Sequence, residues 1–164
     1  MTTQITITLE EAFSGTKRHV SVPSGNRKHH IEVSIPSGVN TGSKVRVLLD
    51  EKVELFIDIN VASHNRFKRV NKDLYVDIEV PFEDAILGGD IQLKTLQTTV
   101  RLKIPPESQN GQKIRLTGLG MPNSNNTKVK GDLYVTLRPT LIKNLTDEEK
   151  DVIVNLKKLL SSRR

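Results

Sequence analysis

Cysteine and tryptophan are both absent from the 164-residue sequence, and aromatic residues make up only 4% of it. Without cysteine, the chain can form no disulfide and can offer no thiolate to a metal ion. Hydrophobic residues account for 35% of the chain, so any core must be modest and aliphatic. This composition favours two small coupled subdomains, or extra burial through self-association, over one large core.

Long apolar segments are also absent. No run of about 18 apolar residues, the length needed to span a bilayer, occurs. The first residues, Met1-Thr2-Thr3-Gln4, have neither the basic region nor the apolar stretch of a signal peptide. We therefore expect a cytoplasmic protein with no membrane partner. The net charge of +6 leaves nucleic acid open as a partner, but scattered basic residues are more typical of a solvated surface.

Arrangements of residues typical of catalysis or metal binding are missing as well. His29 and His30 are adjacent in an extended stretch, so their side chains should point to opposite sides. No nucleophile elbow and no phosphate-binding glycine loop occurs. We expect no enzyme, no cofactor and no metal site.

An internal repeat is the strongest positive feature. Ile35 and Ile104, like Gly42 and Gly111, are 69 residues apart, and IPSGVNTGSKVRV matches IPPESQNGQKIRL in register. Proline ends a strand, glycine permits a positive φ, and the Lys-apolar-Arg-apolar pattern has the period of a half-buried strand. The repeat predicts one strand-turn-strand unit used twice.

Alternating apolar residues predict further strands around both copies of the repeat. Thr8 with Glu11 forms a capping box for a short helix that ends at Gly15, and Pro81 opens an equivalent helix that ends at Gly88. Ala62–Lys72 is polar and basic and is predicted to be a linker. We expect a mainly β protein with subdomains at residues 1–70 and 71–144, followed by a helix at 145–164.

That last helix is amphipathic. Thr146 and Glu149 form a second capping box. One apolar stripe follows at helical spacing, formed by Val152, Ile153, Leu156, Leu159 and Leu160. The stripe needs burial against its own subdomain or against a partner, and the pattern alone favours neither.

Peptide binding is one function that small β-subdomains support, through a sheet edge and an apolar groove. Ile7, Leu9, Val20 and Val22 are placed to line such a groove, although alternating aliphatic residues more often form plain core. Nucleic-acid binding has weaker support, because few aromatic residues are available to stack on bases.

Together, several segments resemble the C-terminal substrate-binding region of DnaJ/Hsp40 co-chaperones. They are ITITLEEAFSG, IPSGVNTGSKVRV, HNRFKRVNKDLYVDIEVPFEDAILGGDIQLKTL, IPPESQNGQKIRLTGLGMP and KGDLYVTL. The resemblance covers nearly the whole chain. It implies two stacked β-sandwich-like subdomains, each with a short helix, and a homodimer joined through the C-terminal helix. It also implies a client-peptide site at Ile7, Leu9, Val20 and Val22, with Phe67 as a further contact.

The resemblance carries three more expectations. Lys17 and Arg18 match a basic cluster that receives the acidic tail of Hsp70 chaperones in some members. No histidine precedes a proline, so the His-Pro-Asp motif of the J-domain is absent, and we expect no ordinary stimulation of the Hsp70 ATPase. The cysteine-rich zinc region is also absent, with the short stretch Pro23–His30 in its place, which indicates the zinc-free class.

We therefore expect a module that binds unfolded or non-native client polypeptides and belongs to a co-chaperone delivering them to a DnaK-type Hsp70. Two alternatives stay open. One is a DNA-binding or nucleoid-associated module, and the other is a purely structural dimerisation module.

Overall fold

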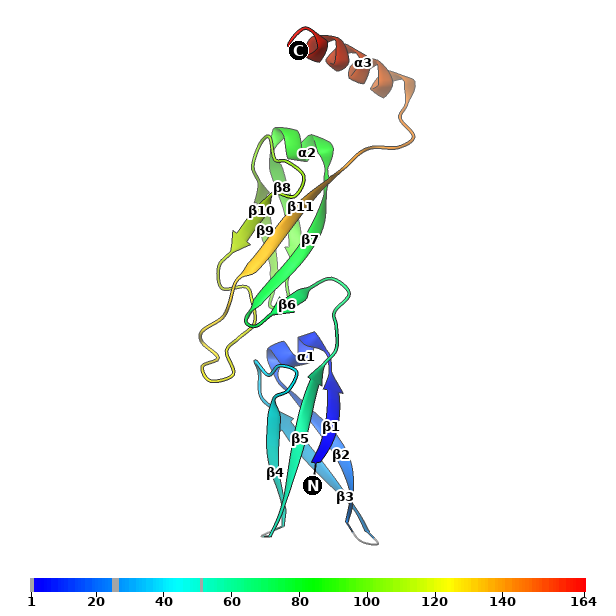
Figure 1. Ribbon diagram of the computed structural model, residues 1–164. Coiled ribbons are helices and arrows are strands. Elements are labelled where there is room, and N and C mark those ends of the chain that lie inside the picture. Colours follow the sequence, from blue (N-terminus) through cyan, green and yellow to red (C-terminus); the bar gives the residue numbers. More distant parts are fainter. Residues whose placement is uncertain (1, 25–26, 51) are drawn as a thin grey trace.

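The computed structural model of the protein describes residues 2–24, 27–50 and 52–164. Two β-sandwiches are stacked end to end, and α3 (Asp147–Ser161) lies beyond the second (Figure 1). The expected fold class, mainly β with a C-terminal helix, is confirmed. None of the helices among these described residues is long and apolar enough to cross a bilayer.

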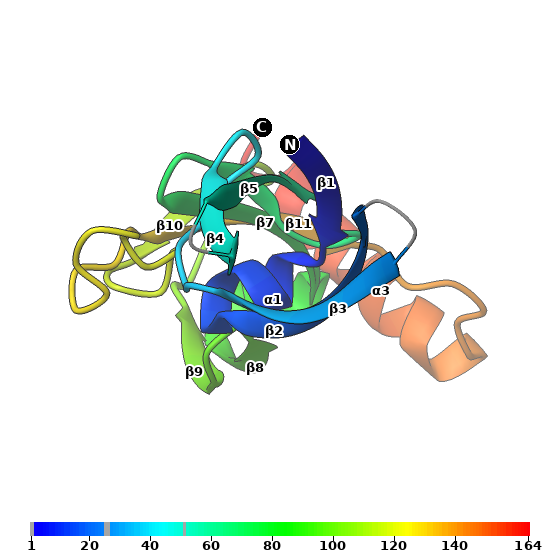
Figure 2. The same cartoon turned by 90° about the horizontal axis from the view of Figure 1, so that it is seen from below.

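The first sandwich packs a three-stranded sheet against a hairpin. Strand β5 (Val53–Val61) is central, with β1 parallel and β4 antiparallel to it. Figure 2 shows the hairpin of β2 and β3 facing this sheet, and Figure 1 shows α1 at the end of the sandwich that lies towards the second one. The remaining elements are β1 (Thr2–Ile7), α1 (Leu9–Ser14), β2 (Thr16–Ser24), β3 (Arg27–Ile35) and β4 (Lys44–Asp50).

The second sandwich repeats this plan. Strand β11 (Leu133–Thr140) is parallel to β7 and antiparallel to β10, as β5 is to β1 and β4. One strand, β6 (Lys68–Val70), is added at the edge beside β7 and lies inside the predicted linker. The other elements are β7 (Asp73–Pro81), α2 (Phe82–Leu87), β8 (Gly89–Lys94), β9 (Thr99–Ile104) and β10 (Lys113–Leu116). By pairing, residues 68–70 belong to the second sandwich, and the division of the chain at residue 70 stays a prediction.

The repeated turns have the same hydrogen bonds. Gly42 N donates to Ile59 O at 2.9 Å, and Gly111 N donates to Leu137 O at 2.8 Å. Both glycines have a positive φ, 94° and 86°, which a side chain would resist. The prediction of one structural unit used twice is confirmed.

Helix starts follow the predicted signals. Thr8 Oγ1 accepts from Glu11 N and Glu11 Oε1 accepts from Thr8 N, both at 3.1 Å. Thr146 and Glu149 form the same reciprocal pair at the start of α3. Pro81 precedes α2 without a side-chain cap. In the stretch Pro23–His30, Pro23 belongs to β2, and Gly25 and Asn26 lie outside the described residues.

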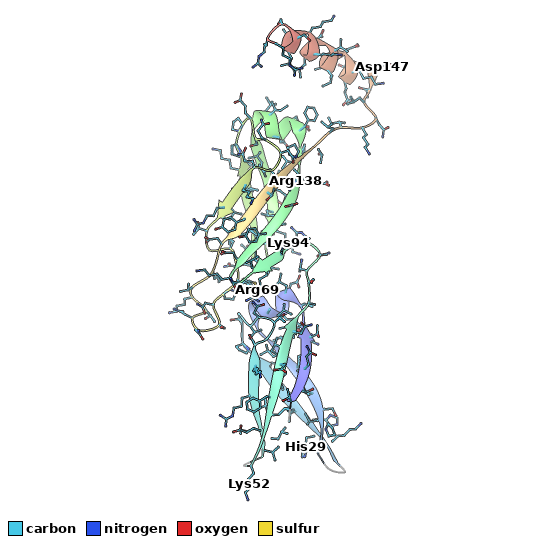
Figure 3. All side chains as sticks on the ribbon, viewed as in Figure 1. His29, Lys52, Arg69, Lys94, Arg138 and Asp147 are labelled. Atoms are coloured by element: carbon cyan, nitrogen blue, oxygen red, sulfur yellow. The ribbon has the colours of Figure 1, made fainter. Side chains whose placement is uncertain are left out.

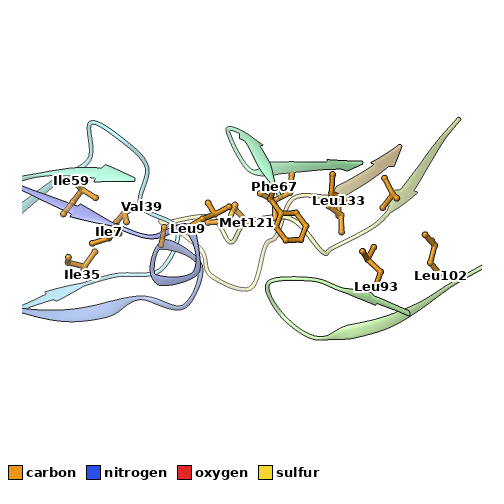
Figure 4. Close-up of a cluster of buried hydrophobic side chains, with 14 of the residues drawn as sticks. Ile7, Leu9, Ile35, Val39, Ile59, Phe67, Leu93, Leu102, Met121 and Leu133 are labelled. Carbon is orange, nitrogen blue, oxygen red and sulfur yellow. The ribbon is translucent and has the colours of Figure 1, made fainter. Parts of the chain in front are cut away.

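The core is continuous from one sandwich to the other. Met121, which lies in the loop between β10 and β11, is fully buried, and Figure 4 shows it between Leu9 of the first sandwich and Phe67. The same loop covers α1, where Lys130 Nζ lies 5.4 Å from the centre of the Phe13 ring. The role of this loop as a contact between the sandwiches is a finding of the structure.

Candidate functional site

The residues predicted to bind client peptide do not form one open surface. Ile7, Leu9 and Val22 are buried in the core of the first sandwich, and Val20 is half-buried at its edge. Alternation correctly placed Ile7, Val20 and Val22 on the inner face of the sandwich, whereas Leu9 is the first residue of α1. Inner-face side chains that pack against each other leave little apolar area for a client, so their part in client binding stays a prediction.

A hollow of about 260 Å³ at the junction of the sandwiches brings two of the predicted residues together. Leu9 comes from the start of α1, and Phe67 comes from the segment that leads into β6. The hollow has an apolar lining from Leu9, Val61, Ala62 and Phe67 and a charged lining from Lys68 and Arg69. It is large enough for one apolar side chain of a bound polypeptide.

His64 separates this hollow from a second one of about 310 Å³. Its Nδ1 accepts hydrogen bonds from the backbone N–H groups of Arg66, at 2.9 Å, and Phe67, at 3.2 Å. Its Nε2 lies 2.6 Å from Glu10 Oε1. Because Nδ1 accepts, the ring proton is on Nε2 and is donated to the carboxylate. The imidazole therefore ties the segment before β6 to α1.

Glu10 is the carboxylate in this contact. Desolvation raises the pKa of Glu10, but hydrogen bonds from its own backbone N–H and from His64 outweigh it, so the pKa is lowered from its ordinary value. Arg66 lies on the other side of the turn, with its guanidinium 5.0 Å from the centre of the Phe67 ring and Nη2 donating to Lys94 O at 3.2 Å. The turn thus contacts both sandwiches, and Figure 3 labels Lys94 and Arg69 at this level of the molecule.

The two predicted tail-binding residues differ in availability. The Lys17 side chain is 71% exposed and forms an ion pair with Glu32 at 3.6 Å. A hollow beside it is lined by Ser14, Thr16, Ser34 and Ser37, among others. Arg18 donates to Glu11 Oε1 at 2.6 Å. Desolvation raises the pKa of Glu11, but hydrogen bonds from Thr8 N, Arg18 and Thr16 outweigh it and lower the pKa. Arg18 therefore supports α1, and Lys17 is the freer of the two cations.

The stripe on α3 is not buried by its own chain. All five predicted residues are exposed or half-buried, and Leu159 is 67% exposed. Four further exposed apolar residues, called the end patch below, are Ile86 and Leu87 at the end of α2 and Leu141 and Ile142 directly after β11. The end patch was not predicted, because a few apolar residues in a short helix and in the segment after a strand resemble ordinary surface. Within the described part of the chain, no group of three His, Asp or Glu side chains is arranged to hold a metal.

Comparison with known proteins places these features in a family. The family model described as DnaJ C terminal domain matches residues 1–141. The chain is 36% identical to chaperone protein DnaJ 2 of Thermus thermophilus over 151 residues, covering 89% of this chain and 51% of that one. It is 32% identical to chaperone protein DnaJ of Caldicellulosiruptor bescii, covering 82% and 37%. It is 29% identical to the curved DNA-binding protein of Coxiella burnetii, covering 91% and 52%. The chain thus spans about half the length of these relatives or less.

Proposed function

Since the chain belongs to the DnaJ C terminal domain family, we propose that it binds unfolded or non-native polypeptides. It would act as the client-binding part of a zinc-free Hsp40-type co-chaperone that delivers clients to an Hsp70 of the DnaK type. The DnaJ chaperones among its relatives support this role. In this proposal, the protein acts in the cytoplasm, without enzymatic activity and without a cofactor.

The junction hollow is the observation that carries this proposal. Two residues of the predicted client site, Leu9 and Phe67, line this same space. One large apolar client side chain buried there gains about 1.5 to 3 kcal/mol. A Kd of 1 mM already requires about 4.1 kcal/mol, so this one side chain needs further contacts along the polypeptide.

Free strand edges supply the second element of binding. The strand order β1-β5-β4 leaves β1 at an edge of its sheet, and β2 pairs only with β3. An edge strand presents unpaired N–H and C=O groups to an extended polypeptide. Val20 is half-buried on β2, so a client lying along β2 would bring side chains to it.

The test of this proposal uses two substitutions that place a charge without emptying the core. Ala62→Asp puts a carboxylate into the junction hollow, and Val20→Asp puts one beside β2. Each should weaken binding of a fluorescent, extended apolar peptide about tenfold or more, because an apolar client group would then desolvate a charge. Suppression of aggregation of a chemically unfolded enzyme, followed by light scattering, should weaken in parallel.

Ala62→Ser and Val20→Thr are the matched controls, since they change size little and add no charge. Circular dichroism at each step establishes that the variants are folded. If both folded Asp variants bind peptide as the parent does, neither the hollow nor the β2 edge binds the client. The buried Leu9 is unsuitable for this purpose, because Leu9→Asp would disrupt the core.

We further propose that Lys17 is the first contact of an acidic Hsp70 tail. Its exposure and its long ion pair with Glu32, at 3.6 Å, leave it accessible to a carboxylate, whereas Arg18 is held by Glu11 at 2.6 Å. The tail would therefore depend more on Lys17 than on Arg18.

Homodimerisation through α3 is also part of the proposal, and the repeat supports it. The end of the first sandwich at α1 is covered by the loop between β10 and β11. The equivalent end at α2 exposes the end patch, in which Leu87 is 76% and Leu141 is 86% exposed. The stripe of α3 is likewise both apolar and exposed. We propose that α3 of a second copy covers the end patch, so that both surfaces are buried together.

DNA binding is the alternative function. The net charge of +6 and the relative named curved DNA-binding protein favour it. Against it, Arg18, Arg46, Arg101 and Arg115 are each paired with a carboxylate. Duplex DNA added to the peptide-binding assay decides between them: competition that falls steeply with salt supports DNA binding, and no competition at low salt removes it.

A further inference from the structure

The imidazole of His64 holds the turn of residues 64–67 through one ring nitrogen and contacts a carboxylate through the other. The N–H groups of Arg66 and Phe67 both point at Nδ1 of His64, which can accept them only while that nitrogen carries no proton. Glu10 lies 2.6 Å from the opposite nitrogen, and its negative charge favours the protonated ring. We propose that His64 is an acid-sensitive latch, closed when the ring is neutral and opened when Nδ1 is protonated.

Protonation would act locally and directly. A proton on Nδ1 would face two N–H donors, so both hydrogen bonds would be lost and the turn would have to move away from the ring. The ring is only 13% exposed in its side chain, and it packs against Phe67 with ring centres 5.3 Å apart. Movement of this turn therefore displaces Phe67, a lining residue of both hollows.

Other charges near the ring do not remove this conflict. Glu10 of α1 is the acidic group that contacts it, while the basic groups lining the two hollows are Arg66, Lys68, Arg69 and Lys94. Arg66 also bonds Lys94 O of β8, so opening the turn loosens a contact to the second sandwich as well.

The direct test is a pH titration of the isotope-labelled full chain by NMR, from about pH 8 to about pH 5, where histidine changes charge. At high pH, the ring nitrogens of His64 should show Nε2 protonated and Nδ1 bare. As the ring titrates, the amide signals of Arg66 and Phe67 should move with it. Their protection from hydrogen exchange, corrected for the intrinsic rate, should fall about tenfold or more.

His64→Asn is the matched variant, because asparagine Oδ1 occupies nearly the position of Nδ1 and accepts from the same N–H groups without titrating. The two amides should then stay protected at low pH. Glu10→Gln keeps an acceptor for Nε2–H, so at high pH the ring should still show Nε2 protonated and Nδ1 bare. His19, His29 and His30 provide internal controls, since their titration should not move these amides.

A ring that titrates without any change at the two amides overturns the latch. So does a ring that stays neutral down to about pH 5. Client binding is measured separately, since its dependence on the latch rests on the function proposed above. If the amides respond to acid but peptide affinity changes equally in the parent and in His64→Asn, the latch stands and the hollow is not the client site.

Discussion

A comparison of Gly38 with Glu107 shows that the contact between the sandwiches depends on glycine at residue 38. They occupy the same position in the repeat, and both have a positive φ, 89° and 58°. The backbone conformation alone therefore does not require glycine. A Cβ atom at Gly38 would lie 2.7 Å from both Pro122 O and Ser124 N, whereas the Glu107 side chain is exposed. Glycine is needed at residue 38 because the loop between β10 and β11 packs against it.

Exchanging these two residues tests that reading. Gly38→Glu should lower the free energy of unfolding by about 2 to 4 kcal/mol, because the loop must move off the turn. Glu107→Gly should change it by less than about 1 kcal/mol, the usual cost of added backbone freedom. Urea unfolding followed by circular dichroism gives both values. Equal losses in the two variants would show that the packing of this loop does not decide the residue.

The client-site residues show what the sequence could predict at this scale. The two-residue period of β2 correctly placed Val20 and Val22 on the inner face. The period does not show whether other core side chains cover the inner face, and in this structure they largely do. His64 and Arg69 gave no signal at all, because a single histidine or arginine in a basic stretch resembles solvated charge. Their roles depend on backbone groups brought together only by folding.

Elements whose signals are local were predictable. Both capping boxes join residues three apart, so Thr8 and Thr146 marked the starts of α1 and α3 from sequence alone. The surface that covers α3 was not predictable, because the amphipathic pattern shows an apolar stripe but not its partner. Figure 1 shows α3 set apart from both sandwiches, at the end of the segment that follows β11. An exposed apolar stripe of this length calls for a partner surface.

Dimerisation through α3 can be tested by comparing substitutions on the two sides of this helix. Leu156 lies within the stripe and Val154 on the opposite side, and both are exposed, at 41% and 48%. Light scattering should give the parent twice its 18.4 kDa mass. Leu156→Asp should weaken the dimer about tenfold or more through lost apolar burial and a buried charge, while Val154→Asp should leave it unchanged. A dimer that survives Leu156→Asp, or one that is weakened equally by both, excludes the stripe as the interface.

At the scale of the whole molecule, the two sandwiches are joined by more than the connecting chain. The Arg69 guanidinium donates to Val39 O at 2.6 Å, to Gly38 O at 3.2 Å and to Asn71 O at 2.7 Å. Burial lowers the pKa of Arg69 from its ordinary value, which marks a desolvated cation satisfied by carbonyl groups. The repeat predicted two units but gave no sign of this junction, because its residues are far apart in sequence and follow no period. Coupled units of this kind should unfold together.

Arg69→Met tests the coupling, because it keeps the apolar stem but removes the donors to all three carbonyl groups. We expect a loss of about 1 to 3 kcal/mol and separate unfolding of the two sandwiches. The chain has no tryptophan, and its two tyrosines, Tyr75 and Tyr134, are stacked in the second sandwich with ring centres 5.1 Å apart. Tyrosine fluorescence therefore reports the second sandwich alone, while far-ultraviolet circular dichroism reports both. The two urea curves should coincide in the parent and diverge in Arg69→Met, with Arg101→Met, which removes only the exposed pair with Asp90, as the control. Coincident curves in Arg69→Met would mean that the buried contact of Met121 with Leu9 and Phe67 couples the sandwiches without the arginine.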